Sequence, residues 1–349
     1  MVNKIFWKNK RVFVTGHTGF KGSWLCLMLS YLGAKVTGYA LKPPTKPNLF
    51  ELCSIDNLIT SVIDDVRNGR ELKKSMLKAA PDVVIHMAAQ PLVRASYKDP
   101  VETYTTNVIG TVNLLEAARS CKSIKAVINV TTDKCYQNRE KKTGYKEDEV
   151  LGGHDPYSSS KACSEIVTSA YRDSFFGSIG IATARAGNVI GGGDWAKDRL
   201  IPDFFRAILF KRKLLIRNPN SIRPWQHVLE PLSGYLILAQ KLVENSKKYS
   251  EAWNFGPDKK DIKSVKWILD YLYTRLGEGD GFEIDSNDHP HETTCLILDS
   301  TKARTRLNWD PKWTLKTALD KIIDWLNCYL QKQDVKAICF NQIEEYLGK

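Results

Sequence analysis

The stretch "RVFVTGHTGFKG", Arg11–Gly22, decides the fold. It begins as a short β-branched run that ends in glycine, which is the pattern of a buried parallel strand. Gly16, Gly19 and Gly22 follow at regular spacing, directly before an apolar stretch that predicts a helix. Glycines at such a junction let the backbone turn tightly and let a pyrophosphate approach the helix amides. Three glycines can also form a simple turn, but their position favours dinucleotide binding.

Strand and helix patterns continue to alternate along the first half of the chain. Further strands are predicted at 35–41, 59–66, 82–89, 126–132 and 179–191, and helices at 22–34, 71–80, 101–121 and 155–175. Strands separated by helices pair in parallel through right-handed crossovers. We therefore predict an α/β protein with a Rossmann-type, doubly wound parallel sheet.

The alternation stops near residue 191. Two segments, 191–208 and 216–228, are rich in Gly, Pro and Asn and are predicted to be loops. A helix predicted at 231–245 returns to the first lobe, and the remainder reads as short strands and amphipathic helices. We expect a dinucleotide-binding domain and a smaller C-terminal α/β substrate lobe, with these bounds: 1–190 plus about 226–256, and about 191–225 plus 257–349.

Composition narrows the class of protein. Hydrophobic residues make up 43% and charged residues 26% of the 349 residues, which is typical of a soluble globular protein. We expect no signal peptide and no membrane span, because no apolar run is long enough. The net charge of +12 is dispersed among acids, which favours anionic small molecules over nucleic acid. Eight cysteines without a Cys-x-x-Cys pair favour buried thiols in a reducing cytoplasm.

Tyr157 and Lys161 form a Tyr-x-x-x-Lys pair near the start of the helix predicted at 155–175, so both lie on one helix face. A tyrosine with its ordinary pKa near ~10 is a poor base at neutral pH. An ammonium group one turn away and an oxidised nicotinamide stabilise the phenolate and lower that pKa. A surface helix face is the alternative, which the glycine motif and the upstream Thr132 make less plausible.

Four motifs in this order resemble the extended short-chain dehydrogenase/reductase family over nearly the whole chain: "TGHTGFKG", "HMAAQ", "TTDK" and "YSSSK". Longer segments, "HMAAQPLVRASY" and "RAGNVIGGGDWAKDRLIPD", are similar to the nucleotide-sugar 4,6-dehydratases of that family, which act in deoxysugar and lipopolysaccharide biosynthesis. The resemblance implies a cytoplasmic lyase with a nucleotide-sugar substrate and NAD as cofactor.

The motifs and the resemblance together predict a set of cofactor contacts. These are Gly16, Thr18, Gly19, Phe20, Lys21, Gly22, Asp65, Val66, Ala88, Ala89, Gln90, Asn107, Thr131, Tyr157 and Lys161. The end of the second strand departs from the usual pattern, because Lys42 and Lys46 stand where an acid normally binds the ribose 2′-hydroxyl. NADP therefore stays open beside NAD. The stretch 64–66 fits an adenine contact or a solvated strand end equally well.

A 4,6-dehydration removes hydride from C4, eliminates water across C5 and C6, and returns hydride to C6. The resemblance implies that Thr132 polarises the substrate hydroxyl, that Tyr157 is the base and that Lys161 is its helper. Related dehydratases usually carry Thr-Asp-Glu at the strand end, whereas this sequence reads Thr-Asp-Lys. By analogy, Asp133 is the acid for the C6 hydroxyl and Lys134 replaces the glutamate base.

A lysine base raises a physical difficulty. A free lysine has a pKa near ~10.4, and a useful base at neutral pH needs roughly 7–8. Burial and nearby positive charge lower a lysine pKa. The alternative is that Lys134 stays charged and stabilises the enolate, leaving proton removal to Tyr157 or water.

Arginines in the second lobe are the predicted ligands of the substrate diphosphate, because guanidinium forks suit adjacent anions. The candidates are Arg199, Arg217 and Arg223, although surface arginines are common. Asn188 matches a position that contacts substrate in relatives. The stretch "NDHPHE" at 287–292 has too few distinctive ligands for a metal site, so no metal is expected.

The resemblance implies a homodimer formed by the helices that contain Thr103–Cys121 and Tyr157–Phe176. Both helices carry apolar residues beyond one core-facing stripe, namely Val108, Leu115, Ile166 and Val167. Burial within the monomer is the alternative explanation.

Two other functions remain open. A nucleotide-sugar 4-epimerase shares the fold and the Tyr-x-x-x-Lys pair but does not need Asp133 and Lys134. A redox-sensing binding protein would keep the dinucleotide fold without turnover. The joint presence of Thr132, Tyr157 and Lys161 argues against that second alternative.

Overall fold

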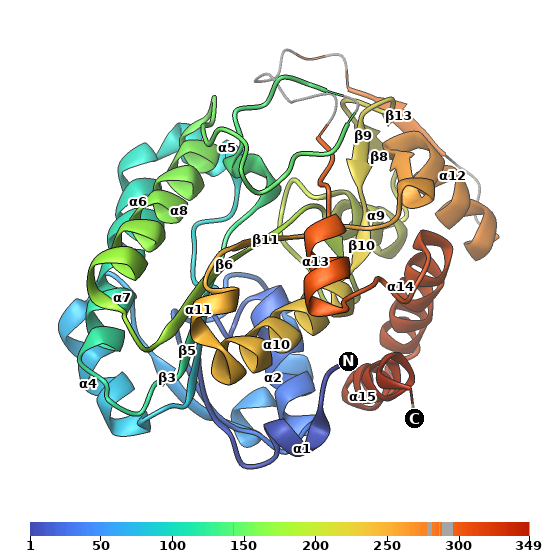
Figure 1. Cartoon of the computed structure of the whole chain (residues 1–349). Helices are drawn as coiled ribbons and strands as arrows, with labels where there is room; N and C mark the ends of the chain where they lie inside the picture. Colours follow the sequence, from blue (N-terminus) through green and yellow to red (C-terminus); the bar gives the residue numbers. More distant parts are fainter. Residues whose placement is uncertain (142, 278–280, 286, 288–295, 349) are drawn as a thin grey trace.

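Seven parallel strands form the central sheet of the computed structural model (Figure 1). Its spatial order is β11-β6-β5-β4-β1-β2-β3, and every neighbouring pair runs parallel. The strands are β1 Arg11–Thr15, β2 Lys35–Ala40, β3 Thr60–Ile63, β4 Val83–His86, β5 Ala126–Val130, β6 Gly180–Ala186 and β11 Ala252–Phe255. The structure describes residues 1–141, 143–277, 281–285, 287 and 296–348. The order reverses between β1 and β4, which confirms the doubly wound sheet.

Helices cover both faces of this sheet. Helices α2 and α10 lie on one face and α4, α7 and α8 on the other, with these bounds in the same order: Phe20–Tyr31, Leu229–Glu244, Gly69–Ala79, Gly110–Arg119 and Pro156–Phe175. Successive side chains of a strand point to opposite faces. Val12 and Val14 of β1 accordingly join the core with α2 and α10, while Phe13 joins the core with α4 and α7.

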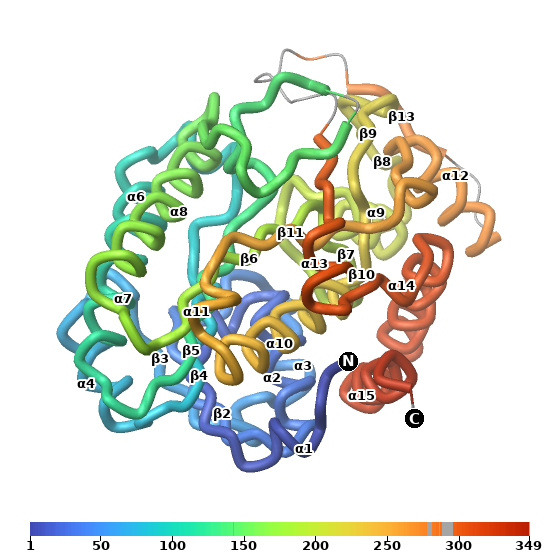
Figure 2. The backbone as a smooth tube through the Cα atoms, viewed as in Figure 1, coloured from blue at the N-terminus to red at the C-terminus, as the bar shows by residue number. Residues whose placement is uncertain are grey.

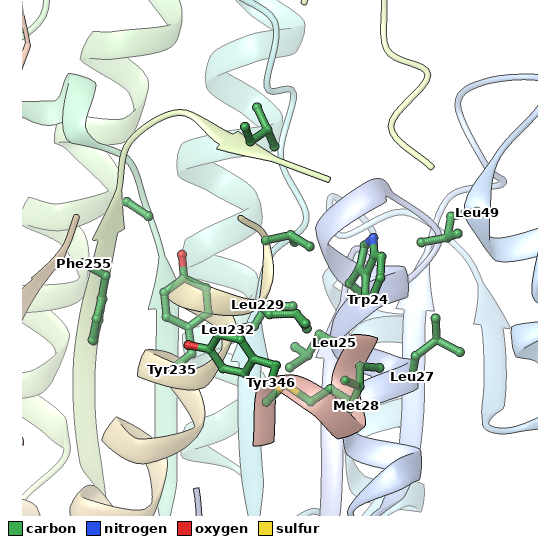
Figure 3. Close-up of a cluster of buried hydrophobic side chains, with 14 of the residues drawn as sticks. Trp24, Leu25, Leu27, Met28, Leu49, Leu229, Leu232, Tyr235, Phe255 and Tyr346 are labelled. Carbon is green, nitrogen blue, oxygen red and sulfur yellow. The ribbon is translucent and has the colours of Figure 1, made fainter. Parts of the chain in front are cut away.

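The core formed by α2 and α10 also includes α15 (Val335–Leu347), the last helix of the described residues. Figure 3 shows Leu25 and Met28 of α2 and Leu232 of α10 in one cluster with Tyr346 of α15. The Tyr346 hydroxyl donates a 2.6 Å hydrogen bond to the buried Glu230 carboxylate on α10. Helix α15 therefore packs on the helix that follows the glycine motif.

The segment predicted as one long helix at 101–121 is interrupted. Helix α6 (Pro100–Tyr104) begins with Asp99 as its N-cap and proline in the first turn, a favourable start. A π-helical turn, Thr105–Ile109, then leads into α7. The long helix predicted here is thus present as α6, the π-helical turn and α7 in direct succession, and only the π-helical turn was not predicted. Such turns are frequent at functional sites, and this one contains Asn107.

The remaining elements form short strand pairs and helices. Strands β8, β9 and β13 and helix α12 lie at the upper right of Figure 1. The pairs are β7 with β10, β9 with β12 and β8 with β13. Their bounds are Val189–Ile190, Gln226–His227, Ile222–Pro224, Ile262–Ser264, Leu214–Ile216 and Phe282–Ile284. The helices are α9 Leu200–Leu209, α12 Val265–Leu276, α13 Thr301–Leu307 and α14 Leu315–Leu330.

Helix α9 corrects the loop prediction for 191–208. Its apolar residues recur at helical spacing, and Phe204 and Phe205 are fully buried. Pro202 suggested a break, but it lies in the first turn, where no intrahelical amide bond is lost.

The path of the chain between its parts is visible as a tube in Figure 2. After β6 the chain leaves the sheet, returns through α10 and β11, and leaves it again toward α12. Seven described cysteines are free thiols, and all except the half-buried Cys163 are buried. Within the described ranges, no helix is both long and apolar enough to span a bilayer. His289, His291 and Cys295 lie outside the described residues.

Candidate active site

The glycine motif forms a tight turn between β1 and α2. Gly16 has φ +76°, and a Cβ there would stand 2.7 Å from the backbone nitrogen of Ala88. A Cβ at Gly22 would stand 2.1 Å from the Gly16 carbonyl oxygen, so neither position accepts a side chain. Gly19 is the N-cap of α2 and makes no side-chain cap bond. The turn thus brings bare backbone to the start of a helix, and this fits the pyrophosphate of a dinucleotide.

Two side chains of the same motif reach beyond the turn. The Thr18 hydroxyl donates to the carbonyl of Leu41, at 2.8 Å, and so ties the turn to the end of β2. Lys21 follows Phe20 in the first turn of α2 and is half-buried. Burial, together with the charges of Lys161 and Arg199, lowers the pKa of Lys21 to about 7, against the pull of Asp133. The predicted cofactor residue Lys21 therefore lies among the predicted catalytic residues.

Asp65 and Val66 follow β3, as predicted. Arg67 holds the Asp65 carboxylate through its Nε and Nη2 atoms, at 2.8 and 2.5 Å. Burial raises the pKa of Asp65, and the bonds from Arg67 outweigh burial, so the pKa is lowered. Val66 is buried against Gly110 of α7, where a Cβ would stand 2.9 Å from Val66 Cγ2. Lys42 and Lys46, beyond β2, are exposed.

The loop after β4 is braced by Asn107. The half-buried Ala88 and Ala89 lead into Gln90, whose backbone amide donates to Asn107 Oδ1 at 2.8 Å. Asn107 Nδ2 donates to the Gln90 carbonyl at 3.1 Å and to Ser160 Oγ at 2.9 Å. The π-helical turn thus joins the loop after β4 to α8.

Thr132 and Asp133 are buried where β5 ends, and Lys134 is half-buried. Thr132 Oγ1 donates to Asp133 Oδ1 at 3.0 Å. Burial raises the pKa of Asp133, although Lys134 and Thr132 lower it. Asp133 Oδ2 is buried without a hydrogen-bond partner among the described residues. A carboxyl group in this setting can hold a proton, and this fits the predicted acid.

Tyr157 and Lys161 lie in the first two turns of α8. Asp155 caps this helix and Pro156 is its first residue. Lys161 Nζ donates to the carbonyl of Val130 at 3.2 Å, and burial lowers the pKa of Lys161 to about 8. Burial raises the pKa of Tyr157 to about 12, while a hydrogen bond with Thr132 lowers it. The structure therefore brings the five predicted catalytic residues together where β5 ends and α8 begins.

Two of the predicted substrate residues, Arg199 and Arg223, act on this centre through their charge. Arg199 precedes α9, donates to Asp194 Oδ2 at 2.9 Å, and its charge lowers the pKa of Tyr157. Arg223 lies on β9, and its charge lowers the pKa of Asp133. Asn188 follows β6, and its carbonyl accepts from Gln226 at 3.0 Å. Arg217 follows β8, and its charge acts on Asp203 of α9.

Several residues around the site were not singled out by sequence analysis. Glu165 lies one turn after Lys161 and is ion-paired with Arg185 on β6, at 2.8 Å. Tyr235 of α10 has its ring centre 5.8 Å from Lys21 Nζ. The four-residue spacing from Lys161 to Glu165 was a readable signal. The charged Arg185 within a strand predicted to be buried was another.

A cavity of about 610 Å³ lies beside the ion pair of Glu165 and Arg185. Its lining includes Glu147, Glu165, Arg185, Glu251 and Lys302. None of the five predicted catalytic residues lines this cavity. The converging reactive side chains, and not this cavity, define the candidate site.

Comparison with known proteins agrees with this geometry. The family model for GDP-mannose 4,6-dehydratase matches residues 13–322. CDP-glucose 4,6-dehydratase of Salmonella typhimurium is 51% identical over 355 aligned residues, covering 100% of this chain and 99% of that protein.

Solved structures give the same result for the fold. The dTDP-glucose 4,6-dehydratase of Bacillus anthracis in complex with NAD is 26% identical, with a TM-score of 0.78, over 92% of this chain and 98% of that one. UDP-glucuronic acid 4-epimerase of Bacillus cereus, at 24% identity, shares the fold with a TM-score of 0.79 over 91% of this chain and 99% of that one. The chain therefore belongs to the GDP-mannose 4,6-dehydratase family, within the extended short-chain dehydrogenases/reductases.

Proposed function

We propose that this chain is a lyase that converts CDP-D-glucose to CDP-4-dehydro-6-deoxy-D-glucose, a step of deoxysugar biosynthesis. The observation that carries the proposal is the 51% identity, over the full length, to the Salmonella CDP-glucose 4,6-dehydratase. The clustering of Asp133 and Lys134 with Tyr157 supports it, because a 4-epimerase needs no acid and base for elimination.

NAD is the proposed cofactor. When bound, it accepts hydride from C4 and returns hydride to C6. The turn at Gly16 and Gly22 fits its pyrophosphate, and the Bacillus anthracis relative was solved with NAD. The exposed Lys42 and Lys46 would also suit a 2′-phosphate, so a comparison of NAD with NADP belongs in the test.

In the first step, Tyr157 takes the proton of the C4 hydroxyl as hydride leaves C4. A tyrosine with a pKa of about 12 needs positive charge nearby to act near neutrality. Lys161, on the same face of α8, and Arg199 supply part of that charge. The Thr132 hydroxyl lies against both Tyr157 and Asp133 and can orient the substrate hydroxyl between them.

In the second step, water is lost across C5 and C6 of the 4-keto sugar. Asp133 gives its proton to the departing C6 hydroxyl, and its unpartnered Oδ2 is the oxygen available for this. Lys134 takes the C5 proton. In the alternative, a charged Lys134 stabilises the enolate and Tyr157 or water takes that proton.

We propose that residues 1–190 and about 226–256 bind the dinucleotide and that about 191–225 and 257–349 bind the nucleotide sugar. Arg217 and Arg223 are the proposed diphosphate ligands, and Asn188 is a further contact. Arg199 is held by Asp194 beside Tyr157, so it is better placed for the sugar than for the diphosphate.

A homodimer in the cytoplasm is also proposed. Val101 of α6, Ile109 of the π-helical turn and Ile166 of α8 are 71%, 49% and 57% exposed, and these three elements are in contact with one another. Exposed apolar residues on such packed helices support a proposed interaction surface. Leu115 does not contribute to this surface. It is fully buried in the core beneath α7, so its assignment to an outward-facing stripe was wrong.

The test incubates purified protein with CDP-glucose and either NAD or NADP, and follows the alkaline absorbance of a 4-keto sugar. Nucleotide hexoses with other nucleobases serve as controls for recognition of the cytosine. A C4 epimer as the product would support the epimerase alternative. Cofactor binding without a product from any nucleotide hexose would support the binding protein.

A further inference from the structure

One buried carboxylate, that of Glu165, binds side chains from two strands. The hydroxyl of Thr131 and the Nε atom of Arg185 both donate to its Oε1. The hydroxyl of Thr183 and Arg185 Nη2 donate to its Oε2, at 2.6 and 2.8 Å. Both oxygens are thus fully used, inside a region where an unpaired charge would be costly.

These bonds join three elements of the reactive centre. Glu165 lies one helical turn after Lys161 on α8. Thr131 directly follows β5 and precedes Thr132, while Arg185 lies on β6, two residues before Gly187. A shift of this carboxylate would therefore move the tyrosine–lysine helix relative to the strand end that carries the proposed acid.

Arg185 fixes the charge of Glu165. Burial raises the pKa of Glu165, but the charge and hydrogen bonds of Arg185 outweigh burial, so Glu165 is ionised at neutral pH. Arg185 is itself held, because its Nη1 donates to Tyr136 Oη at 2.7 Å and its guanidinium lies over the Tyr136 ring, 4.8 Å from the centre.

The groups around Lys161 make Glu165 its main negative neighbour. Burial and, to a lesser extent, the charge of Lys161 lower the pKa of His86 on β4 to about 3, so His86 is neutral. Burial raises the pKa of Cys135 well above its ordinary value, so this thiol is also neutral. Lys21 on α2 adds positive charge when protonated. Against burial, the charge of Glu165 raises the pKa of Lys161.

We propose that Glu165 is a positioning residue: its carboxylate ties α8 to β6 and to the residue after β5, and so fixes Thr132 and Asp133 relative to Tyr157, while its negative charge lies one helical turn from Lys161. This inference rests on the proposed dehydratase function only for its kinetic consequences. The ionisation of Lys161 is a property of the folded chain and can be measured without substrate.

The charge is tested with the double variant Glu165→Gln/Arg185→Gln, because a single Glu165→Gln would leave a buried arginine unpaired and strongly destabilise the fold. Competitive acetylation of Lys161, read by mass spectrometry of its peptide across neutral and alkaline pH, gives the midpoint of its ionisation. We expect this midpoint to fall, by less than for a lone lost opposite charge, because the double variant also removes the positive charge of Arg185. The alkaline limb of kcat/KM should fall with it.

Two variants complete the charge test. Glu165→Asp keeps the charge and should keep the midpoint close to that of the wild type. Glu251→Gln removes another acid that lines the same cavity but pairs with Lys302 and Arg306, so it should leave the midpoint unchanged. An unchanged midpoint in a folded double variant would overturn the electrostatic role.

The positioning role has its own variant, Thr183→Val, which removes one bond to Glu165 and keeps both charges. We expect a lower turnover at every pH with no shift of the Lys161 midpoint, so turnover equal to the wild type would contradict it. This arm also tests the inference if the double variant fails to fold. Absence of product from CDP-glucose with the wild type would refute the proposed function, and the acetylation midpoints would still decide the role of Glu165.

Discussion

Gly187 lies against the carboxylate of Asp133. A Cβ at this glycine would stand 2.9 Å from Asp133 Oδ2 and 2.6 Å from Cγ of Pro224, the neighbour of Arg223 on β9. Gly187 thus leaves space for the unpartnered oxygen of the proposed acid and for a strand of the substrate lobe. The absence of a side chain at one position sets the distance between these two parts of the site.

Gly187→Ala should therefore damage catalysis more than stability. The added methyl group must displace Asp133 or Pro224, and a misplacement near 1 Å can cost ~10²-fold in rate. Overpacking should destabilise the fold by about 1–3 kcal/mol. Turnover and thermal unfolding measure the two effects. Gly177→Ala is the matched control, since nothing lies within 4 Å of a Cβ there. A Gly187→Ala enzyme with wild-type turnover would show that Asp133 needs no such space.

Lys134→Ala should separate oxidation from elimination. Tyr157, Lys161 and Thr132 remain, so C4 oxidation should proceed and the near-ultraviolet absorbance of reduced nicotinamide should accumulate. Exchange of the C5 hydrogen with deuterated solvent should fall by ~10²–10⁴-fold, as expected for a lost general base. Exchange at the wild-type rate would assign proton removal to another group and leave Lys134 as the stabiliser of the enolate.

Two further variants separate the oxidation step from proton removal at C5. Tyr157→Phe should block formation of reduced nicotinamide altogether, because it lacks the base for the first step. Lys134→Glu should recover part of the C5 exchange, since it installs the residue usual in related dehydratases. If both lysine variants exchange equally slowly, a carboxylate at this position cannot reach C5.

Glu230 should make stability depend on pH in a direction unusual for an acid. Burial raises its pKa from 4.5 to about 7, although Tyr346 and two backbone amides lower it. Because the folded-state pKa lies above the unfolded value, its contribution is fully present at acidic pH and is lost as pH rises through about 7. The loss amounts to about 3 kcal/mol at most, so denaturant midpoints should fall from acidic to alkaline pH.

Glu230→Gln should flatten this dependence and be relatively more stable than the wild type at alkaline pH. An amide can still accept from the backbone of Trp313 and donate to Tyr346. Glu244→Gln, at an exposed pair with Lys241, should leave the dependence unchanged. Parallel curves for the wild type and Glu230→Gln would mean that Glu230 does not titrate in this range.

Ile166→Asp should dissociate the proposed dimer. A charge in the middle of an apolar contact loses hydration without gaining a partner. Sedimentation at micromolar concentration should show dimer for the wild type and monomer for the variant. Phe210→Asp is the control, since Phe210 is 67% exposed outside the α6–α8 layer. A wild type that sediments only as a monomer would rule out the dimer.

The sheet and its reactive strand ends could be predicted because both follow from local rules. A β-branched strand, a glycine turn and the start of an apolar helix are visible at Arg11–Gly22, and the right-handed crossovers then limit the possible strand orders. Since parallel strands end at one edge, Thr132 and Asp133 had to meet the ligands bound there. The pairing of Tyr157 with Lys161 follows from helical spacing alone.

What could not be predicted depends on contacts between distant segments. The ion pair of Glu165 with Arg185 joins a helix to a strand, and only the folded sheet brings them together. The inward orientation of Leu115 depends on how α7 packs on the sheet and on α4. The space beside Gly187 is set by Pro224, from a segment predicted as a loop.

The packing of α15 on α2 has a consequence for the synthesis of the protein. The helix that begins at the pyrophosphate turn is made long before α15, yet Leu25 and Met28 pack in one cluster with Tyr346 of α15 (Figure 3). Until α15 has left the ribosome, part of that apolar face stays open to water and to chaperones. A chain that stopped before α15 would contain every predicted catalytic residue and still lack part of the cover of its first long helix.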